Sequence, residues 1–391
     1  MRFPYYSPNF GLLDLFRAFF TSRTKAEKVL LEYYKQITGK SYAFLTNSCR
    51  TALYLAYQAF EKQGEVITSP LTCKVAIDPV VESGNKPVYA DITIDDLNIN
   101  PNDIEGRITS NTVAIQAIHL GGVSCNMDII GDIAKREKLV VIEDCAQSLG
   151  SYYKSKHTGS YGNIACFSLI KNAYGIGGGV FVTNNLEIYK KALFINNTFS
   201  KPSKILLYYR VIRNILDTYR FSLLGHLMYS NFVKIKGSHK SFSTVKNQLK
   251  QISSLEKRIA AVQLKKYEKL HYCRKKIGDE LSLQLTKENL MHNSLNINKN
   301  SYSKFFIYNP QIQSSTHIKE LHKLGVEAMH LEQSKSSPVQ EWLIAKDKAI
   351  AEGLIQYAKV HNHIFSIPII ERYGKEKVAA MVNSIIKTLS K

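Results

Sequence analysis

The sequence predicts an α/β protein, in which a large, mostly parallel sheet domain covered by helices is joined to a smaller C-terminal α+β domain. The first observation is that short apolar runs alternate with helix-length segments from residue 42 to residue 183, as in parallel strands linked by crossover helices. The second is that this alternation stops near residue 195, beyond which short strands and helices mix. We therefore expect a large ligand-binding domain at residues 1–250 and a small domain at residues 251–391.

Seven apolar runs fit strands of the large sheet: Tyr42–Thr46, Val66–Thr68, Val88–Ile92, Val113–Ile118, Leu139–Glu143, Ala165–Leu169 and Gly179–Thr183. The first helix is expected at residues 24–37, because Thr24 and Glu27 have the spacing of a capping box. Further helices are expected at Thr51–Glu61, Lys74–Glu82, Met127–Lys135, Leu255–Lys276, Val339–Ala358 and Glu376–Thr388. Ligands of such sheets bind beyond the carboxyl ends of the strands, so functional residues are sought there.

Composition limits the class of protein. An apolar fraction of 45% over 391 residues is typical of a folded chain and excludes a disordered one. The six cysteines form no CxxC pair and no Cys/His cluster, so we expect neither a disulfide framework nor a metal site. No apolar run reaches the roughly 18 residues of a membrane span. Pro4, Pro8 and Asp14 interrupt the segment where a signal peptide needs an apolar core, so we expect a cytoplasmic protein.

The first motif is Val141-Ile-Glu-Asp-Cys-Ala-Gln147, an apolar strand that ends in Asp144. A carboxylate at this point can pair with a protonated ring nitrogen of a bound ligand, and Gln147 could reach a hydroxyl group of the same ring. The alternative is structural, because an aspartate that follows a strand often caps the next helix.

The second motif is Phe167-Ser-Leu-Ile-Lys171, followed by the glycine-rich run Gly175–Gly179. An apolar stretch here delivers a single lysine, and a lysine whose pKa is lowered by desolvation can form a Schiff base. Ser168 could donate a hydrogen bond to a phosphate group, and the glycines allow backbone to approach a flat ligand closely. The alternative is a surface lysine that precedes a flexible hairpin.

In the third motif, within residues 46–53, a strand turns into a helix at Cys49 and Arg50. The backbone N–H groups at the start of a helix, together with an arginine, can bind an anion. Ordinary capping by Asn47 or Ser48 would account for the same residues without any ligand.

The fourth motif is Ile118-His-Leu-Gly-Gly122, which places His119 at a strand end. A contact between His119 and the substrate is one interpretation. A lone histidine at such a point is more often structural, and both interpretations stay open here.

The order and spacing of these motifs resemble those of the sugar aminotransferase family named after DegT, DnrJ, EryC1 and StrS. This family is a branch of the fold-type-I pyridoxal phosphate enzymes. The resemblance runs from about Thr24 to about Leu193 and resumes at Ser253. Its most specific segments are Val66–Pro70, Ile118–Gly122 with Asn126–Asp128, Ile142–Gln147, Cys166–Lys171, Ser253 and Leu255 with Gln263–Leu264, and Phe365–Pro368.

The resemblance implies that the cofactor is pyridoxal 5′-phosphate (PLP) and that Lys171 is the Schiff-base lysine and proton shuttle. Asp144 would then pair with the pyridine nitrogen, and Gln147 would contact the phenolic oxygen. Ser168 and the turn at Cys49 and Arg50 would hold the phosphate. The remaining cofactor contacts would be Ala146, under one face of the ring, and Cys73, where the family commonly stacks an aromatic residue.

The resemblance also implies the reaction. An aminotransferase of this family would take an amino group from a donor such as glutamate and pass it to a nucleotide-linked keto-sugar, for surface polysaccharides or other glycans. A homodimer with residues of both subunits at each site is expected. Two alternatives stay open: a PLP-dependent sugar dehydratase, in which histidine commonly replaces the lysine, and a non-catalytic, membrane-associated scaffold of the same fold.

Of the net charge of +20, +9 lies in an insert at residues 201–250, which has ten Lys or Arg residues but one acidic residue, Asp217. Within it, apolar residues recur at helical spacing: Ile205, Tyr208, Tyr209, Ile212, Ile215, Leu216 and Tyr219. Arg210, Arg213 and Arg220 stand away from this stripe. The stripe could be buried against the partner subunit or the active-site mouth, or residues 204–235 could contact the inner face of an anionic membrane, aided by Phe10–Phe20. Nucleic acid is not an expected partner, because no binding motif accompanies the charge.

Overall fold

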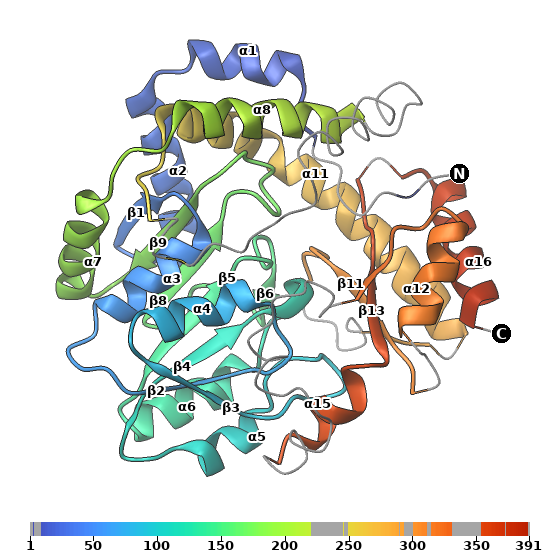
Figure 1. The fold of residues 1–391 in the computed structure, drawn as a ribbon, viewed down its shortest axis with the longest axis horizontal. Helices are drawn as coiled ribbons and strands as arrows, with labels where there is room; N and C mark the ends of the chain where they lie inside the picture. The colour runs from blue at the N-terminus through green and yellow to red at the C-terminus, as the bar shows by residue number, and fades with distance from the viewer. Residues whose placement is uncertain are drawn as a thin grey trace.

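The computed structural model describes residues 3, 9–219, 245, 249–288, 290–292, 300–310, 314–330, 353–371 and 373–389. Its N-terminal unit is built on a seven-stranded sheet of order β1-β9-β8-β5-β4-β2-β3 (Figure 1). The strands are β1 (Tyr42–Thr46), β2 (Glu65–Thr68), β3 (Lys86–Tyr89), β4 (Thr112–Ile118), β5 (Val140–Cys145), β8 (Ile164–Ser168) and β9 (Gly179–Thr183). Only β9 runs antiparallel to its neighbours. The predicted α/β class and mostly parallel sheet are therefore confirmed.

Helices cover both faces of this sheet (Figure 1). They are α2 (Arg23–Thr38), α3 (Cys49–Gln58), α4 (Lys74–Glu82), α5 (Pro101–Ile104), α6 (Met127–Arg136) and α7 (Leu186–Thr198), with 3₁₀ turns at Glu105–Arg107 and Leu120–Gly122. A small hairpin of β6 (Tyr152–Tyr153) and β7 (Lys156–His157) follows β5. The strands have buried side chains on both faces, which explains why they read as continuous apolar runs in the sequence.

Two helix starts differ from the prediction, and capping explains both. The side chain of Ser22 accepts a hydrogen bond from Lys25 N, so α2 begins at Arg23 and the predicted capping box of Thr24 with Glu27 is wrong. Helix α3 begins at Cys49, earlier than predicted, because Ser48 Oγ accepts from Thr51 N at 3.1 Å.

The C-terminal unit is a four-stranded antiparallel sheet of order β10-β11-β13-β12. Its elements are β10 (Met291–His292), β11 (Phe305–Tyr308), β12 (Met329–His330), β13 (Ile364–Ile367), α12 (Ser314–Lys323), α15 (Ile355–Val360) and α16 (Lys375–Leu389). The α+β expectation agrees with these elements. Most of the helix predicted at Val339–Ala358 lies outside the described residues.

One long helix, α11 (Ser254–Lys287), is shared by the two units. Ser253 and Glu256 form a capping box at its start. Its first half packs into the core of the large sheet through residues such as Leu264, and its second half packs into the core of the small sheet through residues such as Leu281. Because α11 belongs to both cores, the boundary between residues 250 and 251 stays a prediction.

Helices α1 (Leu12–Phe20) and α8 (Lys204–Tyr219) lie side by side across the start of α11 (Figure 1). Buried Ala18 of α1 and Val211 of α8 pack with Ile259 and Val262 of α11. The predicted helix in the first part of the insert is thus confirmed, whereas residues 220–244 lie outside the described part of the chain.

Candidate active site

A cavity of about 250 Å³ lies beyond the carboxyl ends of β4, β5 and β8, and we call it the strand-end cavity. All nine residues predicted for the site line it: Cys49, Arg50, Cys73, His119, Asp144, Ala146, Gln147, Ser168 and Lys171. Nine further residues, for which the sequence predicted no role at the site, also line it: Asn47, Ser48, Leu53, Thr72, Val75, Ala76, Ile118, Ile170 and Arg210. The four motifs, which lie at the ends of different strands, therefore meet in one cavity.

Asp144 lies at the end of β5 and is buried. Its Oδ1 accepts from Ala146 N at 3.0 Å and from Cys49 Sγ at 3.9 Å. Burial raises the pKa of this carboxyl group, although the positive charge of Lys171 acts in the opposite direction. Turns and a short hairpin follow β5, so Asp144 caps no helix, and a cationic partner in the cavity would stabilise its charged form.

Lys171 follows β8 in a loop that is anchored on both sides. Leu169 N donates to Gly178 O at 3.0 Å, which closes the loop. The neighbouring Asn172 is buried and donates to the main-chain oxygens of Gln147 and Leu149, both at 3.1 Å. Lys171 itself lines the cavity. The alternative of a surface lysine before a flexible hairpin does not fit this placement.

The side chain of Gln147 has one end fixed by the protein. Its Oε1 accepts from Gly121 N at 3.0 Å, and the residue is buried. The amide nitrogen is therefore the group that can donate to a ligand in the cavity. A hydroxyl or phenolate oxygen of a bound ring fits such a donor.

A potential anion cradle lies at the start of α3. Ser48, Cys49 and Arg50 line the cavity and include the first residues of α3, where the helix dipole has its positive end. Ser168 Oγ accepts from Ile170 N at 3.3 Å, which leaves its hydroxyl proton for another acceptor. The Ser48 cap and the anion cradle coexist, because the cap uses the N–H of Thr51.

His119 is fully buried, and both of its ring nitrogens have protein partners. Nδ1 accepts from Cys125 N at 3.1 Å, so Nε2 carries the proton and donates to Glu143 Oε2 at 3.1 Å. The predicted substrate contact is thus not available through a nitrogen, although the residue lines the cavity. This arrangement favours the structural interpretation of His119.

Glu143, for which the sequence predicted no role, is a buried carboxylate with hydrogen bonds to both of its oxygens. It also accepts from the main-chain N–H groups of Gly159, Tyr161 and Gly162 at 2.5–2.8 Å. Burial alone would raise the pKa of Glu143, but the hydrogen bond from His119 and these N–H donors hold it below its ordinary value. His119, Glu143 and Cys145 lie close enough together to resemble a metal cluster, yet the N–H donors already satisfy the carboxylate.

Ala146 and Cys73, the remaining residues predicted to contact the cofactor, also line the cavity. Ala146 is a small residue just after β5, and Cys73 stands at the start of α4 without a side-chain capping bond. Cys73 offers much less stacking surface than an aromatic side chain would.

Arg210 is the residue of this cavity that lies farthest along the chain. It comes from α8, and its Nη1 donates to Glu256 Oε1 of α11 at 2.5 Å. Because the Glu256 side chain is fully buried, this ion pair holds the arginine against the site. The sequence analysis grouped Arg210 with Arg213 and Arg220 as a cation that could face a membrane, whereas in the structure it lines the strand-end cavity.

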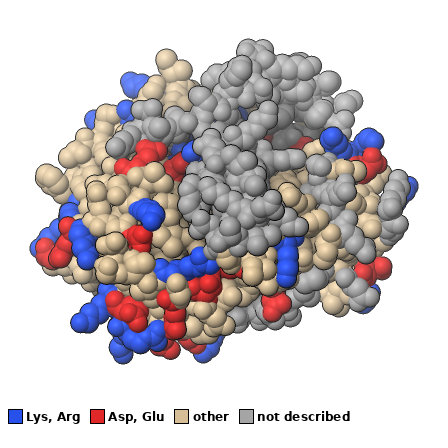
Figure 2. Space-filling view, turned by 60° about the horizontal axis from the view of Figure 1, so that its bottom comes forward, with Lys and Arg blue, Asp and Glu red and all other residues tan. Residues whose placement is uncertain are grey.

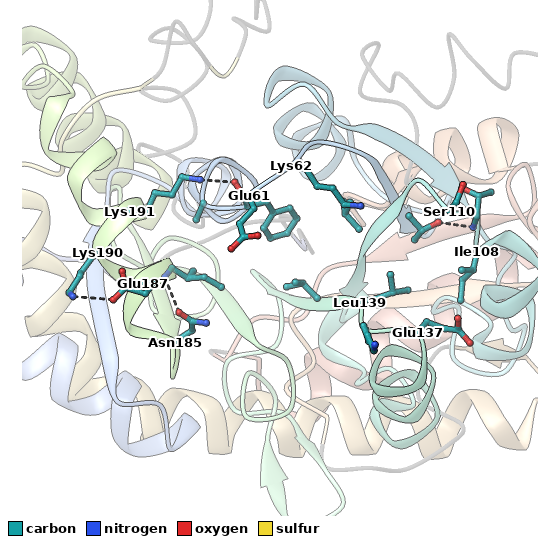
Figure 3. Close-up of a pocket in the computed structure, with 18 residues that line it drawn as sticks. Glu61, Lys62, Ile108, Ser110, Glu137, Leu139, Asn185, Glu187, Lys190 and Lys191 are labelled. Atoms are coloured by element: carbon teal, nitrogen blue, oxygen red, sulfur yellow. Dashed lines mark hydrogen bonds and ion pairs between the residues drawn. The ribbon is translucent and has the colours of Figure 1, made fainter.

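A larger hollow of about 910 Å³ lies at the opposite, amino-terminal edge of the sheet, and we call it the rear cavity (Figure 3). It is lined by the starts of β4 and β5, the end of α3 and the start of α7. Its charged residues, such as Glu61, Lys62 and Lys190, are exposed at the rim. It contains no buried carboxylate among the residues described, so it offers no counterpart to Asp144.

The model of the DegT/DnrJ/EryC1/StrS aminotransferase family matches residues 19–386. The chain belongs to this family. Among curated relatives, this family member is 38% identical over 157 residues to the spore coat polysaccharide biosynthesis protein SpsC of Bacillus subtilis. That match covers 39% of this chain and 40% of SpsC. It is also 36% identical over 156 residues to GDP-perosamine synthase of Escherichia coli O157:H7, covering 39% and 43% of the two chains. The aligned part thus spans about two fifths of these relatives.

The fold extends over the whole chain. Helicobacter pylori PseC, an aminotransferase involved in the biosynthesis of pseudoaminic acid, has a TM-score of 0.76 with 20% identity, and the match covers 100% of both chains. The predicted fold-type-I architecture of the family is therefore confirmed.

Proposed function

We propose that the protein is a PLP-dependent aminotransferase that carries its cofactor on Lys171 and transfers an amino group to a keto-sugar. One observation carries the proposal: a lysine in an anchored loop and a buried, poorly compensated aspartate line the same cavity at the carboxyl ends of the strands. Membership of an aminotransferase family supports it independently.

The residues present fit this cofactor. Asp144 lies where a protonated pyridine nitrogen would compensate its burial, and Gln147 offers an amide donor for the phenolic oxygen. Ser168 and the start of α3, with Cys49 and Arg50, offer donors for the phosphate. When bound, PLP supplies an electron sink for the carbon that gains or loses the amino group.

Lys171 has two roles in this proposal. Its amine holds the cofactor between turnovers, and it then moves a proton between the substrate carbon and the cofactor as a general acid–base group. Asp144 would hold the pyridine nitrogen of the bound cofactor in its protonated form. The anchored loop around Asn172 keeps the lysine amine in reach of the ring, which limits the loss of conformational freedom during each proton transfer.

The acceptor in this proposal is a nucleotide-linked keto-sugar, glutamate is the donor, and the product enters a surface polysaccharide or another glycan. The names of the relatives, which include a GDP-sugar synthase and a polysaccharide biosynthesis protein, support this substrate class. The working unit is a homodimer in the cytoplasm. Lys171 favours amino transfer over the dehydratase alternative.

The test is a screen of nucleotide 4-keto- and 3-keto-sugars with ¹⁵N-glutamate. The proposal predicts a ¹⁵N-labelled amino-sugar and one equivalent of 2-oxoglutarate. A deoxygenated sugar without ¹⁵N would establish the dehydratase instead. Wild-type protein that binds no PLP and converts no sugar would favour the scaffold.

We also propose that the protein contacts the inner face of a membrane through helix α8 of the insert and helix α1. Helices α1 and α8 present an exposed apolar surface, which we call the α1–α8 face: Leu12, Leu13, Phe16, Phe19, Phe20, Ile205, Leu206, Tyr208, Ile212 and Tyr219. Phe19 is 72% exposed and Ile205 is 82% exposed, and exposed apolar patches mark interaction surfaces. Among the described helices, none is both long and apolar enough to cross a bilayer.

The charges around this face suit anionic lipid better than another protein surface. Both acidic residues of the two helices, Asp14 and Asp217, are buried beside cations, whereas Arg17 and Lys204 are exposed. By contrast, the side of the molecule in Figure 2 interleaves basic with acidic residues. Arg213 forms an ion pair with Asp217 at 3.6 Å, and Arg220 lies outside the described residues. The apolar side chains therefore carry the proposed contact.

Vesicle flotation tests this contact. Protein should float with vesicles containing phosphatidylglycerol, and the pair Phe19→Ser and Ile205→Ser should reduce the floating fraction severalfold. The matched control is Phe194→Ser on α7, which is equally exposed but lies outside the face. Absence of flotation together with a dimer that Phe19→Ser dissociates would show that a second copy of the chain covers the face.

A further inference from the structure

Arg210 lies beside the anion cradle at the start of α3. Gly177 is packed against the Arg210–Glu256 pair, because a Cβ atom added at Gly177 would lie 2.1 Å from Glu256 Oε1 and 3.0 Å from Arg210 Nη1. The next residue, Gly178, donates to Asn47 O at 2.9 Å and bridges to Ser48.

The residue after Gly178, Gly179, also packs against the start of α3. A Cβ atom at Gly179 would lie 2.5 Å from Cys49 N, the first N–H of α3. The glycine run thus connects Arg210 to the helix start over two residues. Its positive φ of 106° at Gly178 is a conformation that other residues rarely adopt.

The chemistry at this end of the cavity is that of a phosphate site. A helix start, the hydroxyl group of Ser168 and a guanidinium group converge there, whereas Asp144 lies at the end of β5. A guanidinium group has five N–H donors, and Glu256 accepts one of them. Glu256 is itself held by Ser253 N at 2.8 Å, so it fixes the direction of the arginine.

We propose that Arg210, supplied by the insert of the same chain, binds the phosphate group of the cofactor. This inference rests on the proposed PLP function of the strand-end cavity. It gives α8 two roles, because the exposed side of the helix forms part of the α1–α8 face while Arg210 on its inner side completes the cradle. An anion in the site would then stabilise the position of α8.

The test compares PLP with pyridoxal, which lacks the phosphate group. Apoprotein is titrated with each compound by absorbance, for wild type and for Arg210→Gln. The variant should bind PLP about tenfold or more weakly, the effect of losing a charge-assisted hydrogen bond, while its affinity for pyridoxal is unchanged. Lys204→Gln on the same helix is the control for lost charge and should bind both compounds like wild type.

Two further arms separate the other roles of Arg210. If it only neutralises Glu256, the double variant Arg210→Gln with Glu256→Gln would regain wild-type PLP affinity, and the proposal would be overturned. If it binds the acceptor, Arg210→Gln would keep its PLP affinity and lose affinity for uridine diphosphate in the holoenzyme, which also overturns it. Wild-type protein that binds neither PLP nor pyridoxal would refute the PLP function itself, a result distinct from either.

Discussion

The strand-end cavity and the rear cavity lie at opposite edges of one sheet and differ in what they bury. The rear cavity is larger, about 910 Å³ against about 250 Å³, but its charged residues stand at an exposed rim. The strand-end cavity is small, and it contains a buried aspartate, an amide with one fixed end and a lysine in an anchored loop. A buried carboxylate whose pKa stays raised despite its protein partners therefore identifies the site better than volume does.

The largest expected effect is that of Lys171→Ala. Loss of the group that holds the cofactor and moves the proton should lower kcat by about 10³-fold or more. Lys62→Ala, in the rear cavity, is the matched lysine control and should retain wild-type kcat. Steady-state rates with glutamate and the identified acceptor give kcat for both variants. Equal losses of kcat would mean that the strand-end cavity is no more important for catalysis than the rear cavity.

A smaller loss is expected for Asp144→Asn. An amide cannot keep the ring nitrogen protonated, so kcat should fall by roughly 10²-fold, as for other preorganised charged contacts. The PLP affinity of the variant should fall much less, because the phosphate contacts remain. A variant with unchanged kcat would mean that Asp144 does not face the ring nitrogen.

Asp144→Asn should increase the stability of the apoprotein, although it lowers kcat. Asp144 has a raised pKa in the folded protein, so the folded state binds more protons than the unfolded state between the ordinary pKa and the raised one. The stability of the apoprotein therefore falls as pH rises between these two pKa values. Asp144→Asn apoprotein should therefore unfold at a higher temperature than wild type at pH 7, and the difference should shrink at pH 4. Differential scanning calorimetry of apoprotein at both pH values measures this. Lower stability of the variant at pH 7 would contradict it.

The smallest effect is expected in the rear cavity. Lys138→Ala and Lys190→Ala remove exposed charges, and exposed ion pairs such as Lys190 with Glu187 contribute at most about 1 kcal/mol. Both variants should keep kcat and KM within about twofold of wild type. A tenfold change in either constant would show that the rear cavity binds a ligand of its own.

The sequence predicted the parts of the site that are local. Asp144 lies at the end of a buried apolar strand, and Gln147 and Lys171 follow such strands. Parallel strands bring their carboxyl ends to one edge of the sheet, whatever the arrangement of the helices. Arg210 could not be predicted in this way, because its position depends on Glu256, 46 residues away, and on the packing of α8 against α11. The cap at Ser22 and the hydrogen bonds of His119 likewise depend on contacts that spacing alone does not specify.

The most direct test of the proposed function is to find the cofactor on the chain. Holoenzyme is purified with PLP, reduced with borohydride, digested and analysed by mass spectrometry. We expect a pyridoxyl-phosphate adduct on the peptide that contains Lys171, and its loss in Lys171→Ala. A wild-type chain without an adduct, or with the adduct on a rear-cavity lysine such as Lys62, would contradict the central claim.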